Sequence, residues 1–239
     1  MSDSGVAART SVSDRVAQVL SRVEYRRAAG TELEAIFRLR YDAYRREGAI
    51  DERPHKWLDD KFDDDVNAHQ IGIYIDGTLA SALRVHVASA EHCSSPAVDN
   101  FPDVLVDELD RGKIIIDPNR FVVDFASSRL YPELPFITLR LPFIAAGHFG
   151  ADLVTATVRR EHQAFYRREL LMTPVCPPRP YPTLTKHLGL MIVDFHEAGD
   201  AVLRRRPFYG STAAERNHIF GERVATLAAQ PVPTGLAWN

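Results

Sequence analysis

The sequence predicts an α/β (α+β) fold with one mixed, mostly antiparallel sheet flanked by helices. Two strand patterns, at 70–76 and 78–87, are joined by Asp76-Gly77, a turn typical of antiparallel hairpins. Further along the chain, strand patterns alternate with helix patterns, which favours one sheet covered by helices. A doubly wound nucleotide-binding sheet is not expected, because the sequence contains neither a G-x-G-x-x-G motif nor a Walker loop.

Length and composition favour a single main domain. The chain has 239 residues, of which 45% are hydrophobic, and it can bury a large core. We expect residues 1–22 to form a mobile segment and a short helix capped by Ser13. Residues 23–239 are expected to form one domain with a C-terminal helical extension from about residue 197.

Composition also argues against several classes of function. A net charge of −3 gives no general attraction to nucleic acid. No apolar run approaches the roughly 20 residues that span a bilayer, and the first residues lack a signal-peptide pattern. We therefore expect a cytoplasmic protein without stable membrane insertion. The nine histidines lack the spacing of a metal-ligand pair, so no metal is expected.

The predicted domain opens with a helix followed by the hairpin. Thr31 and Glu34 form a capping-box signature for a helix over 31–46. Arg40 lies on the apolar stripe of this helix, where a charge is unusual. In the second hairpin strand, Arg84 shares a face with small alanines, which leave room beside its guanidinium.

The remaining elements alternate between helix and strand. Apolar spacing and the positions of glycine and proline set their expected limits. In chain order they are a short helix or irregular cover at 101–109, a strand at 113–124, a buried helix at 136–148, a strand at 152–158, a helix at 159–171, a strand at 189–195, and helices at 198–206 and 211–229.

The strand at 113–124 contains the most informative residues. Its run Ile-Ile-Ile-Asp-Pro-Asn-Arg-Phe-Val-Val places Asp117, Asn119 and Arg120 within an apolar segment. Buried polar groups cost free energy unless they are paired or used, so these residues mark either a structural network or a site. Pro118 lacks the N–H that a sheet ladder needs, so we expect the sheet to splay here.

Four further charged residues have two possible interpretations. Asp60 and Asp63 lie in an acidic run that is interleaved with Trp57, Leu58 and Phe62, so the run is either a solvated face or a partner for a buried arginine. The guanidinium groups of Arg40 and Arg84 favour carboxylate partners, from the protein or from a substrate. These four residues therefore form either a structural ion-pair network or part of a binding site.

Asp117 and Tyr166 are candidate proton-transfer groups. A carboxylate near an apolar wall can accept a proton from an attacking amine, directly or through water. The structural alternative is that Asp117 pairs with Arg120 or caps a bulge. Tyr166 could give a proton to a leaving thiolate, or it could be an ordinary core tyrosine.

These motifs together match a known pattern. The sequence carries, in this order, Arg40-x-x-x-Tyr44, Asp60-x-x-Asp63, Arg84 and Asp117-x-Asn119-Arg120-Phe121. This order resembles the autoinducer synthase family, which makes acyl-homoserine lactones and has Arg-x-x-x-Phe, Asp-x-x-Asp, a strand arginine and Glu-x-Ser-Arg-Phe. It is also similar to the related N-acyl amino acid synthases, which share the fold of the GCN5-related acyltransferase superfamily. The resemblance covers roughly residues 33–172.

The resemblance implies a GCN5-related N-acyltransferase-like fold, with a splay between two central strands, and a role for each matching residue. Asp117 stands where the family has its candidate base, and Arg84 or Arg40 is expected to hold the carboxylate of the acceptor. The implied catalytic residues are Asp117, Arg120, Arg84 and Tyr166, and the implied substrate-binding residues are Arg40, Tyr44, Asp60, Asp63, Asn119 and Phe121.

Departures from the pattern bear on the chemistry. Asp117 is one methylene shorter than the family's glutamate, and Asn119 replaces a serine. The superfamily's Arg/Gln-x-x-Gly-x-Gly pyrophosphate loop is missing after Val123. Its absence disfavours free coenzyme A and is compatible with an acyl carrier protein, which presents the acyl-phosphopantetheine arm without a nucleotide. No tightly bound cofactor is implied.

The resemblance therefore implies an N-acyltransferase that moves a fatty acyl group from an acyl carrier protein thioester to the amine of an amino acid or similar small acceptor. One alternative is an acyl-homoserine lactone synthase that consumes S-adenosylmethionine. A second is an acyl-coenzyme A-dependent acetyltransferase of the GCN5-related type. A third is a non-catalytic module that binds an acyl chain or a carrier protein.

Overall fold

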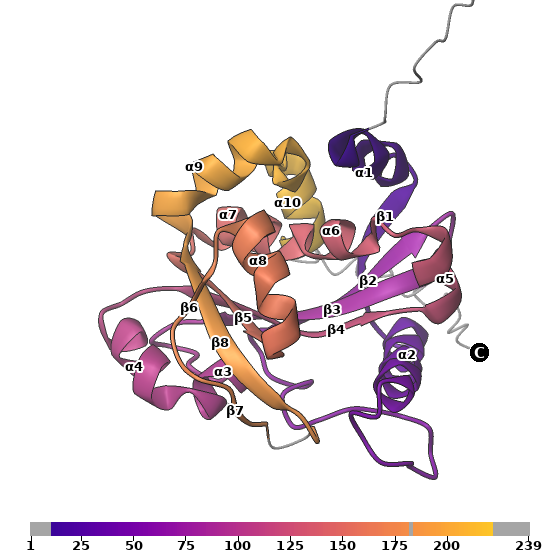
Figure 1. Ribbon diagram of the computed structural model, residues 1–239, viewed down its shortest axis with the longest axis horizontal. Helices are drawn as coiled ribbons and strands as arrows, with labels where there is room; N and C mark the ends of the chain where they lie inside the picture. Colours follow the sequence, from indigo (N-terminus) through magenta and orange to yellow (C-terminus); the bar gives the residue numbers. More distant parts are fainter. Residues whose placement is uncertain (1–10, 182–183, 222–239) are drawn as a thin grey trace, which may run out of the picture.

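The computed structural model describes residues 11–181 and 184–221, which form one sheet with helices on both faces (Figure 1). The eight strands pair in the order β1-β2-β3-β4-β5-β8-β6, with β7 also paired to β8. Every neighbouring pair is antiparallel except β4 and β5. The predicted mixed, mostly antiparallel sheet is confirmed.

The strands are β1 (Val23–Arg27), β2 (Ala68–Ile75), β3 (Thr78–Ala88), β4 (Ile115–Val123), β5 (Leu153–Val158), β6 (Thr173–Pro174), β7 (Arg179–Pro180) and β8 (His187–Asp194). The helices are α1 (Val12–Leu20), α2 (Thr31–Arg46), α3 (Pro96–Asn100), α4 (Pro102–Asp110), α5 (Phe125–Leu130), α6 (Leu134–Thr138), α7 (Arg140–Phe149), α8 (Gln163–Leu170), α9 (Phe195–Arg205) and α10 (Ala213–Phe220), with short 3₁₀ turns at Arg160–His162 and Pro207–Tyr209.

The two faces of the sheet are covered by different helices. Helices α6 to α10 lie above the sheet in Figure 1, and α2, α3 and α4 lie below it. The largest apolar cluster includes buried side chains of α6, α7, β3 and β5, such as Ile137, Ile144 and Val154. A second cluster packs α2 against the other face through Ile36 and Phe37. The open edge between β4 and β5 therefore lies between two packed layers.

The hairpin between β2 and β3 forms as the sequence predicts. Asp76 and Gly77 have φ values of 48° and 79°, the positive angles that a two-residue type I′ turn requires. Arg22 donates from Nε to Oδ1 of Asp76 at 3.1 Å, which ties the turn to the segment before β1. Local turn chemistry thus fixes the register of β3 and the position of Arg84 on it.

The predicted splay is present between β4 and β5. Their parallel pairing is limited to Ile115 with Leu153 and Ile116 with Val154. Beyond these residues β4 continues along β3, while β5 continues along β8. Pro118, which has no N–H to donate, lies in the part of β4 that is not paired with β5. The separation opens the centre of the sheet.

The buried helix expected at 136–148 is two helices in the structure. Helix α6 ends at Thr138, and α7 begins at Arg140 and ends at Phe149, followed by Gly150 as a left-handed cap with a φ of 62°. Pro142 explains the break, because it cannot donate a hydrogen bond to the carbonyl of Thr138 and its ring would crowd that carbonyl in a continuous helix. Leu139 therefore separates two helices where the sequence predicts one.

The N-terminal caps of α1 and α2 differ from those that the sequence predicts. Helix α1 is capped by Ser11, whose side chain accepts from the N–H of Asp14, and Ser13 lies within the helix. Helix α2 begins at Thr31, but its N-cap is Gly30 and the cap makes no side-chain hydrogen bond. The capping box expected there was therefore wrong, because Gly30 adopts a φ of 53° that only glycine reaches easily.

Parts of two expected elements lie outside the described residues. These are the mobile segment predicted for the start of the chain, up to residue 10, and the end of the helix predicted at 211–229. The described part of that helix is α10, which ends at Phe220.

Candidate active site

A buried ion-pair network lies between α2, the acidic loop and β3. The side chains of Arg40 and Arg84 are both 0% exposed. Arg84 donates from Nη1 to Asp60 at 2.7 Å and to Asp63 at 2.6 Å, and Arg40 donates to Asp63 at 2.7 Å and also to Gln70. Each guanidinium therefore has carboxylate partners, as a buried arginine requires.

The electrostatics of this network keep its carboxylates ionised. Burial raises the pKa of Asp60, but hydrogen bonds from Arg84 and the positive charge of Arg120 outweigh it and hold the pKa below its usual range. The pKa of Asp63 is also lowered, because the attraction of Arg40 and Arg84 exceeds the effect of burial. Burial lowers the pKa of Arg40 to about 10, so it stays charged at neutral pH.

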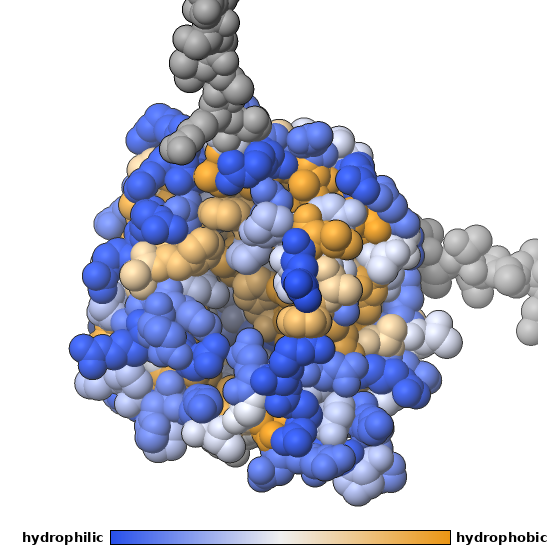
Figure 2. Space-filling view, turned by 45° about the vertical axis from the view of Figure 1, so that its right-hand side comes forward, coloured by the Kyte–Doolittle hydropathy of each residue, from blue (hydrophilic) through white to orange (hydrophobic). Residues whose placement is uncertain are grey.

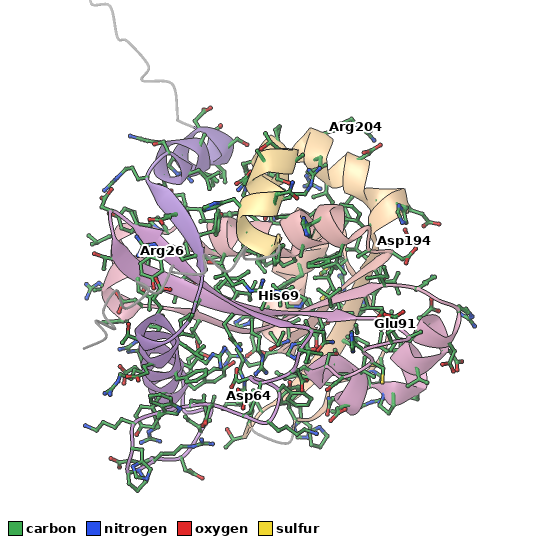
Figure 3. The ribbon with its side chains drawn as sticks, turned by 180° about the vertical axis from the view of Figure 1, so that it is seen from behind. Arg26, Asp64, His69, Glu91, Asp194 and Arg204 are labelled. Carbon is green, nitrogen blue, oxygen red and sulfur yellow. The ribbon has the colours of Figure 1, made fainter. Side chains whose placement is uncertain are left out.

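Strand β4 is joined to this network at the splay. Arg120 donates from Nε to Oδ2 of Asp60 at 2.8 Å, and its Nη2 contacts the same oxygen. Asn119 accepts from Nε of Arg84 at 2.6 Å, and its amide lies 3.1 Å from Nδ1 of His86. Arg120 adopts a φ of 53° at the register shift between β3 and β4, so the strand is irregular there. The labelled Asp64 shows that the acidic loop lies on the α2 side of the sheet, opposite Arg204 on α9 (Figure 3).

Asp117 is buried as well, but its carboxylate has other partners. It is 1% exposed, and Oδ2 accepts from the N–H of Ala97, the second residue of α3, at 2.9 Å. Oδ1 accepts from the hydroxyl of Thr155 on β5 at 3.4 Å. The carboxylate thus holds α3 and β5 against β4. Asp117 is not among the residues that line the cavity described next.

A cavity of about 600 Å³ occupies the splay. One group of its lining residues is polar and comes from β4, α2, α8 and the loop after β7; it consists of Tyr44, Asn119, Arg120, Tyr166 and Tyr181. A second group is apolar and belongs to the cluster that packs on the side of α6, α7 and α8; it consists of Leu83, Phe121, Leu139, Ala156, Val158 and Phe165. The molecular face in Figure 2 is hollowed, and apolar side chains gather beside the hollow. Small-molecule sites commonly have this size and composition.

Three tyrosines meet at the polar end of this cavity. Burial raises the pKa of Tyr166, and nearby Tyr44 raises it further. Burial also raises the pKa of Tyr181, followed by the negative charge of Asp117, while Arg120 opposes the shift. The guanidinium carbon of Arg120 lies 5.6 Å from the ring centre of Tyr44. The phenols of Tyr166 and Tyr181 are therefore protonated donors at neutral pH.

The structure divides the residues predicted from the sequence into three sets. Tyr44, Asn119, Arg120, Phe121 and Tyr166 line the cavity. Arg40, Arg84, Asp60 and Asp63 form the buried network behind it. Asp117 is buried among α3, β4 and β5.

Tyr181 and most of the apolar lining are not among the site residues predicted from the sequence. Tyr181 lies in the proline-rich stretch after α8, which the sequence marks only as a break between elements. The one local feature that could have indicated a role for Tyr181 is its position between Pro180 and Pro182. Its position beside β4 depends on contacts with residues far away in the sequence.

Comparison with known protein families shows to which family this chain belongs. The family model for the N-acyl amino acid synthase FeeM matches residues 35–194, more than half of the chain. The chain belongs to this family. It is an N-acyltransferase, and the resemblance inferred from the motifs is confirmed. No curated protein matches the sequence.

Solved structures agree on the fold. The structure of FeeM, an N-acyl amino acid synthase from uncultured soil microbes, matches 77% of this chain and 96% of its own, with a TM-score of 0.63 and 19% identity. TofI, solved with an inhibitor and MTA, matches 79% of this chain and all of its own, with a TM-score of 0.57 and 15% identity. BjaI, a coenzyme A-dependent acyl-homoserine lactone synthase, gives a TM-score of 0.53 over 73% of this chain and 82% of its own, with 18% identity.

Two further observations concern the described residues as a whole. None of their helices has the length and apolar character needed to cross a membrane. Within the same part of the chain, the histidine, cysteine and acidic side chains form no cluster of three or more that could hold a metal ion.

Proposed function

We propose that the protein is an N-acyl amino acid synthase, which transfers a fatty acyl group from a carrier-protein thioester to the amine of an amino acid. The observation that carries this proposal is the cavity in the splay, because it joins an apolar group of side chains to a polar end that contains Arg120. A fatty acyl chain fits the apolar group of side chains, and a charged acceptor fits the polar end.

The apolar lining supports a long acyl donor. Leu83, Leu139 and Ala156 are 1%, 2% and 3% exposed, so the cavity reaches deep into the core between the sheet and the upper helices. Burying a methylene group there is worth about 0.8 kcal/mol. The thioester carbonyl would then lie in the splay, next to Asn119 and Arg120.

Arg120 is the best placed residue to bind the acceptor carboxylate. The sequence assigned this role to Arg84 or Arg40, but both are completely buried and neither lines the cavity. Arg120 lines it and is held by Asp60. A guanidinium can bind a carboxylate through two parallel hydrogen bonds.

The position of Asp117 does not suit the base role that the family resemblance implies. Its side chain is 1% exposed and does not line the cavity. We assign Asp117 a positioning role instead, because it holds β5 and α3 against β4 and places a negative charge near Tyr181.

Helix α5 favours a carrier protein over coenzyme A as donor. It follows β4, where the superfamily's pyrophosphate loop is expected, and it is capped by Asp124, whose carboxylate accepts from the N–H of Ser127 at 2.8 Å. A carboxylate in this place occupies the backbone donor and repels a phosphate. The cavity is also bordered by Arg46, Arg159 and Lys186, which complement an acidic partner surface.

Mass spectrometry of cells that overproduce the protein tests this function. We expect new N-acyl amino acids in the extract, and none from cells that produce a variant with Arg120→Ala. Accumulation of an acyl-homoserine lactone with consumption of S-adenosylmethionine would favour the rival reaction. An extract without new acyl amides would contradict the proposal.

A further inference from the structure

We propose that Tyr181 is a catalytic residue whose phenol donates a hydrogen bond to the thioester carbonyl oxygen as the amine attacks. This inference rests on the proposed acyl transfer and adds to it the group that stabilises the oxyanion. Tyr181 belongs to none of the motifs that relate the chain to its family.

The first support is the way in which the backbone of Tyr181 is fixed. The residue directly follows β7, which pairs Arg179 with Leu188 and Pro180 with His187. After Tyr181, the N–H of Leu184 donates to its carbonyl at 3.0 Å. The phenol therefore projects from a backbone that is held on both sides.

The same segment is also attached to the end of α2. The N–H of Thr185 donates to the carbonyl of Ala49 at 3.1 Å, and its hydroxyl donates to the carbonyl of Gly48 at 3.1 Å. Leu184 packs against the cluster of Tyr41, Ile50 and Leu58. These contacts close one wall of the cavity and keep Tyr181 next to Tyr44.

The second support is the electrostatic environment of the phenol. Tyr181 lines the cavity together with Asn119 and Arg120. Burial and the charge of Asp117 raise its pKa, so the phenol keeps its proton, while Arg120 supplies a positive charge beside it. A neutral phenol next to a guanidinium is suited to a developing negative charge on oxygen.

Tyr181 is better placed for this role than Tyr166. Both phenols lie at the polar end of the cavity, but their surroundings differ. The pKa of Tyr166 is raised by burial and by Tyr44, with no charged group among the causes. Tyr181, by contrast, lies within the electrostatic influence of Asp117, Arg120 and Arg84. The reacting carbonyl must lie near the acceptor carboxylate, and therefore near Arg120.

In the proposed step, the lone pair of the neutral amine forms a bond to the thioester carbon. The carbonyl π electrons move to oxygen, which accepts the hydrogen bond of the Tyr181 hydroxyl. When the carbonyl reforms, the carbon–sulfur bond breaks and the thiolate leaves with its electron pair. The proton released from nitrogen passes through solvent to the thiolate, and Tyr181 keeps its own proton throughout.

Single substitutions test the role of the hydroxyl. We expect Tyr181→Phe to lower kcat by about 10²–10³, as for loss of one oxyanion donor, with little change in KM for the acyl donor. Tyr131→Phe is the matched control, because this tyrosine accepts from Arg22 at 3.2 Å and does not line the cavity. A kcat for Tyr181→Phe within twofold of the control would overturn the proposal.

A fluorinated tyrosine at position 181 keeps the hydroxyl and lowers its pKa. The fluorinated phenol loses its proton at lower pH and then can no longer donate. We therefore expect the kcat of the fluorotyrosine protein to fall as the pH rises from neutral to alkaline, over a range in which the unmodified enzyme stays active. An identical pH profile would also overturn the proposal. The unmodified enzyme is the internal reference. If it forms the amide, and both Tyr181→Phe and the fluorotyrosine protein show the same kinetics as the unmodified enzyme, only the proposed role of Tyr181 is wrong. If it forms no amide, the proposed function fails first.

Discussion

Arg120 on β4 donates from Nε to Oδ2 of Asp60 at 2.8 Å, and this contact joins the cavity wall to the buried ion-pair network. The two residues are 60 positions apart in the sequence. Asp60 also accepts from Arg84. One carboxylate therefore positions Arg120, which lines the cavity, and balances the charge of Arg84, which does not line it. The network therefore supports the site without facing the substrate.

Asp60→Asn should destabilise the fold. It keeps the shape of the side chain but leaves Arg84 and Arg120 without their shared negative charge, which costs about 3–5 kcal/mol for a buried pair. Urea unfolding measures the change. The exposed Asp59→Asn is the control and should stay within about 0.5 kcal/mol of the wild type. Equal stability of the two variants would show that the network adds nothing.

Acid should weaken the same network. The pKa values of Asp60 and Asp63 are lowered in the folded protein, so the stability that they contribute is complete above their unfolded pKa of about 3.9. It is lost as the pH falls through the folded values. Unfolding free energies measured from about pH 7 down to pH 3 should therefore drop below about pH 4. The gap between wild type and Asp60→Asn should shrink over that range, and a constant gap would contradict this assignment.

Arg120→Lys should weaken binding of the acceptor carboxylate. A lysine cannot form two parallel hydrogen bonds, so we expect KM for the amino acid to rise about tenfold or more, which corresponds to about 1.4 kcal/mol. The decarboxylated amine provides the decisive comparison, because its KM should change far less. Arg38→Lys, on the exposed face of α2, is the matched control. Equal losses for both acceptors would place the carboxylate elsewhere.

Ala156→Leu should shorten the preferred acyl chain. Ala156 lies on β5, is 3% exposed and lines the cavity, so a larger side chain fills space that the acyl chain would occupy. With a series of donors, kcat/KM should fall about 10–100-fold for the longest chains and little for short ones, since each lost methylene contact is worth about 0.8 kcal/mol. Ala164→Leu, exposed on α8, should leave the series unchanged. A uniform loss at every length would rule out Ala156 as a determinant of chain length.

Charge reversal at the cavity rim should weaken the carrier-protein donor. Arg159→Glu with Lys186→Glu replaces two positive charges by two negative charges on residues that border the cavity. We expect KM for the acyl carrier protein to rise, most strongly at low salt, while KM for a small acyl-pantetheine stays constant. Arg160→Glu, exposed and outside the lining, is the control. If both donors respond equally, the rim does not contact the carrier.

Local patterns were sufficient to predict much of the fold. The hairpin followed from Asp76-Gly77, and the splay followed from polar residues and Pro118 within an apolar strand. Pro142 could also have predicted the break between α6 and α7, because the missing N–H acts within one helical turn. These features depend on neighbouring residues, which is why the sequence reveals them.

The missing parts of the site depend on long-range contacts. Tyr181 reaches the cavity because the segment after it binds the end of α2, through a contact between Thr185 and Gly48 that spans 137 residues. Similarly, Arg84 and Arg120 share an aspartate that only the folded sheet brings between them. Motif order identified the residues near the site, but not which of them face the cavity.

Incubation of the purified protein with an acyl-carrier-protein thioester and an equal mixture of amino acids tests the proposed acyl transfer itself. We expect release of free carrier thiol together with an equal amount of an N-acyl amino acid, detected by mass spectrometry, and no lactone when S-adenosylmethionine is added. Thiol release without an acyl amide, or stable binding of the carrier without turnover, would contradict it.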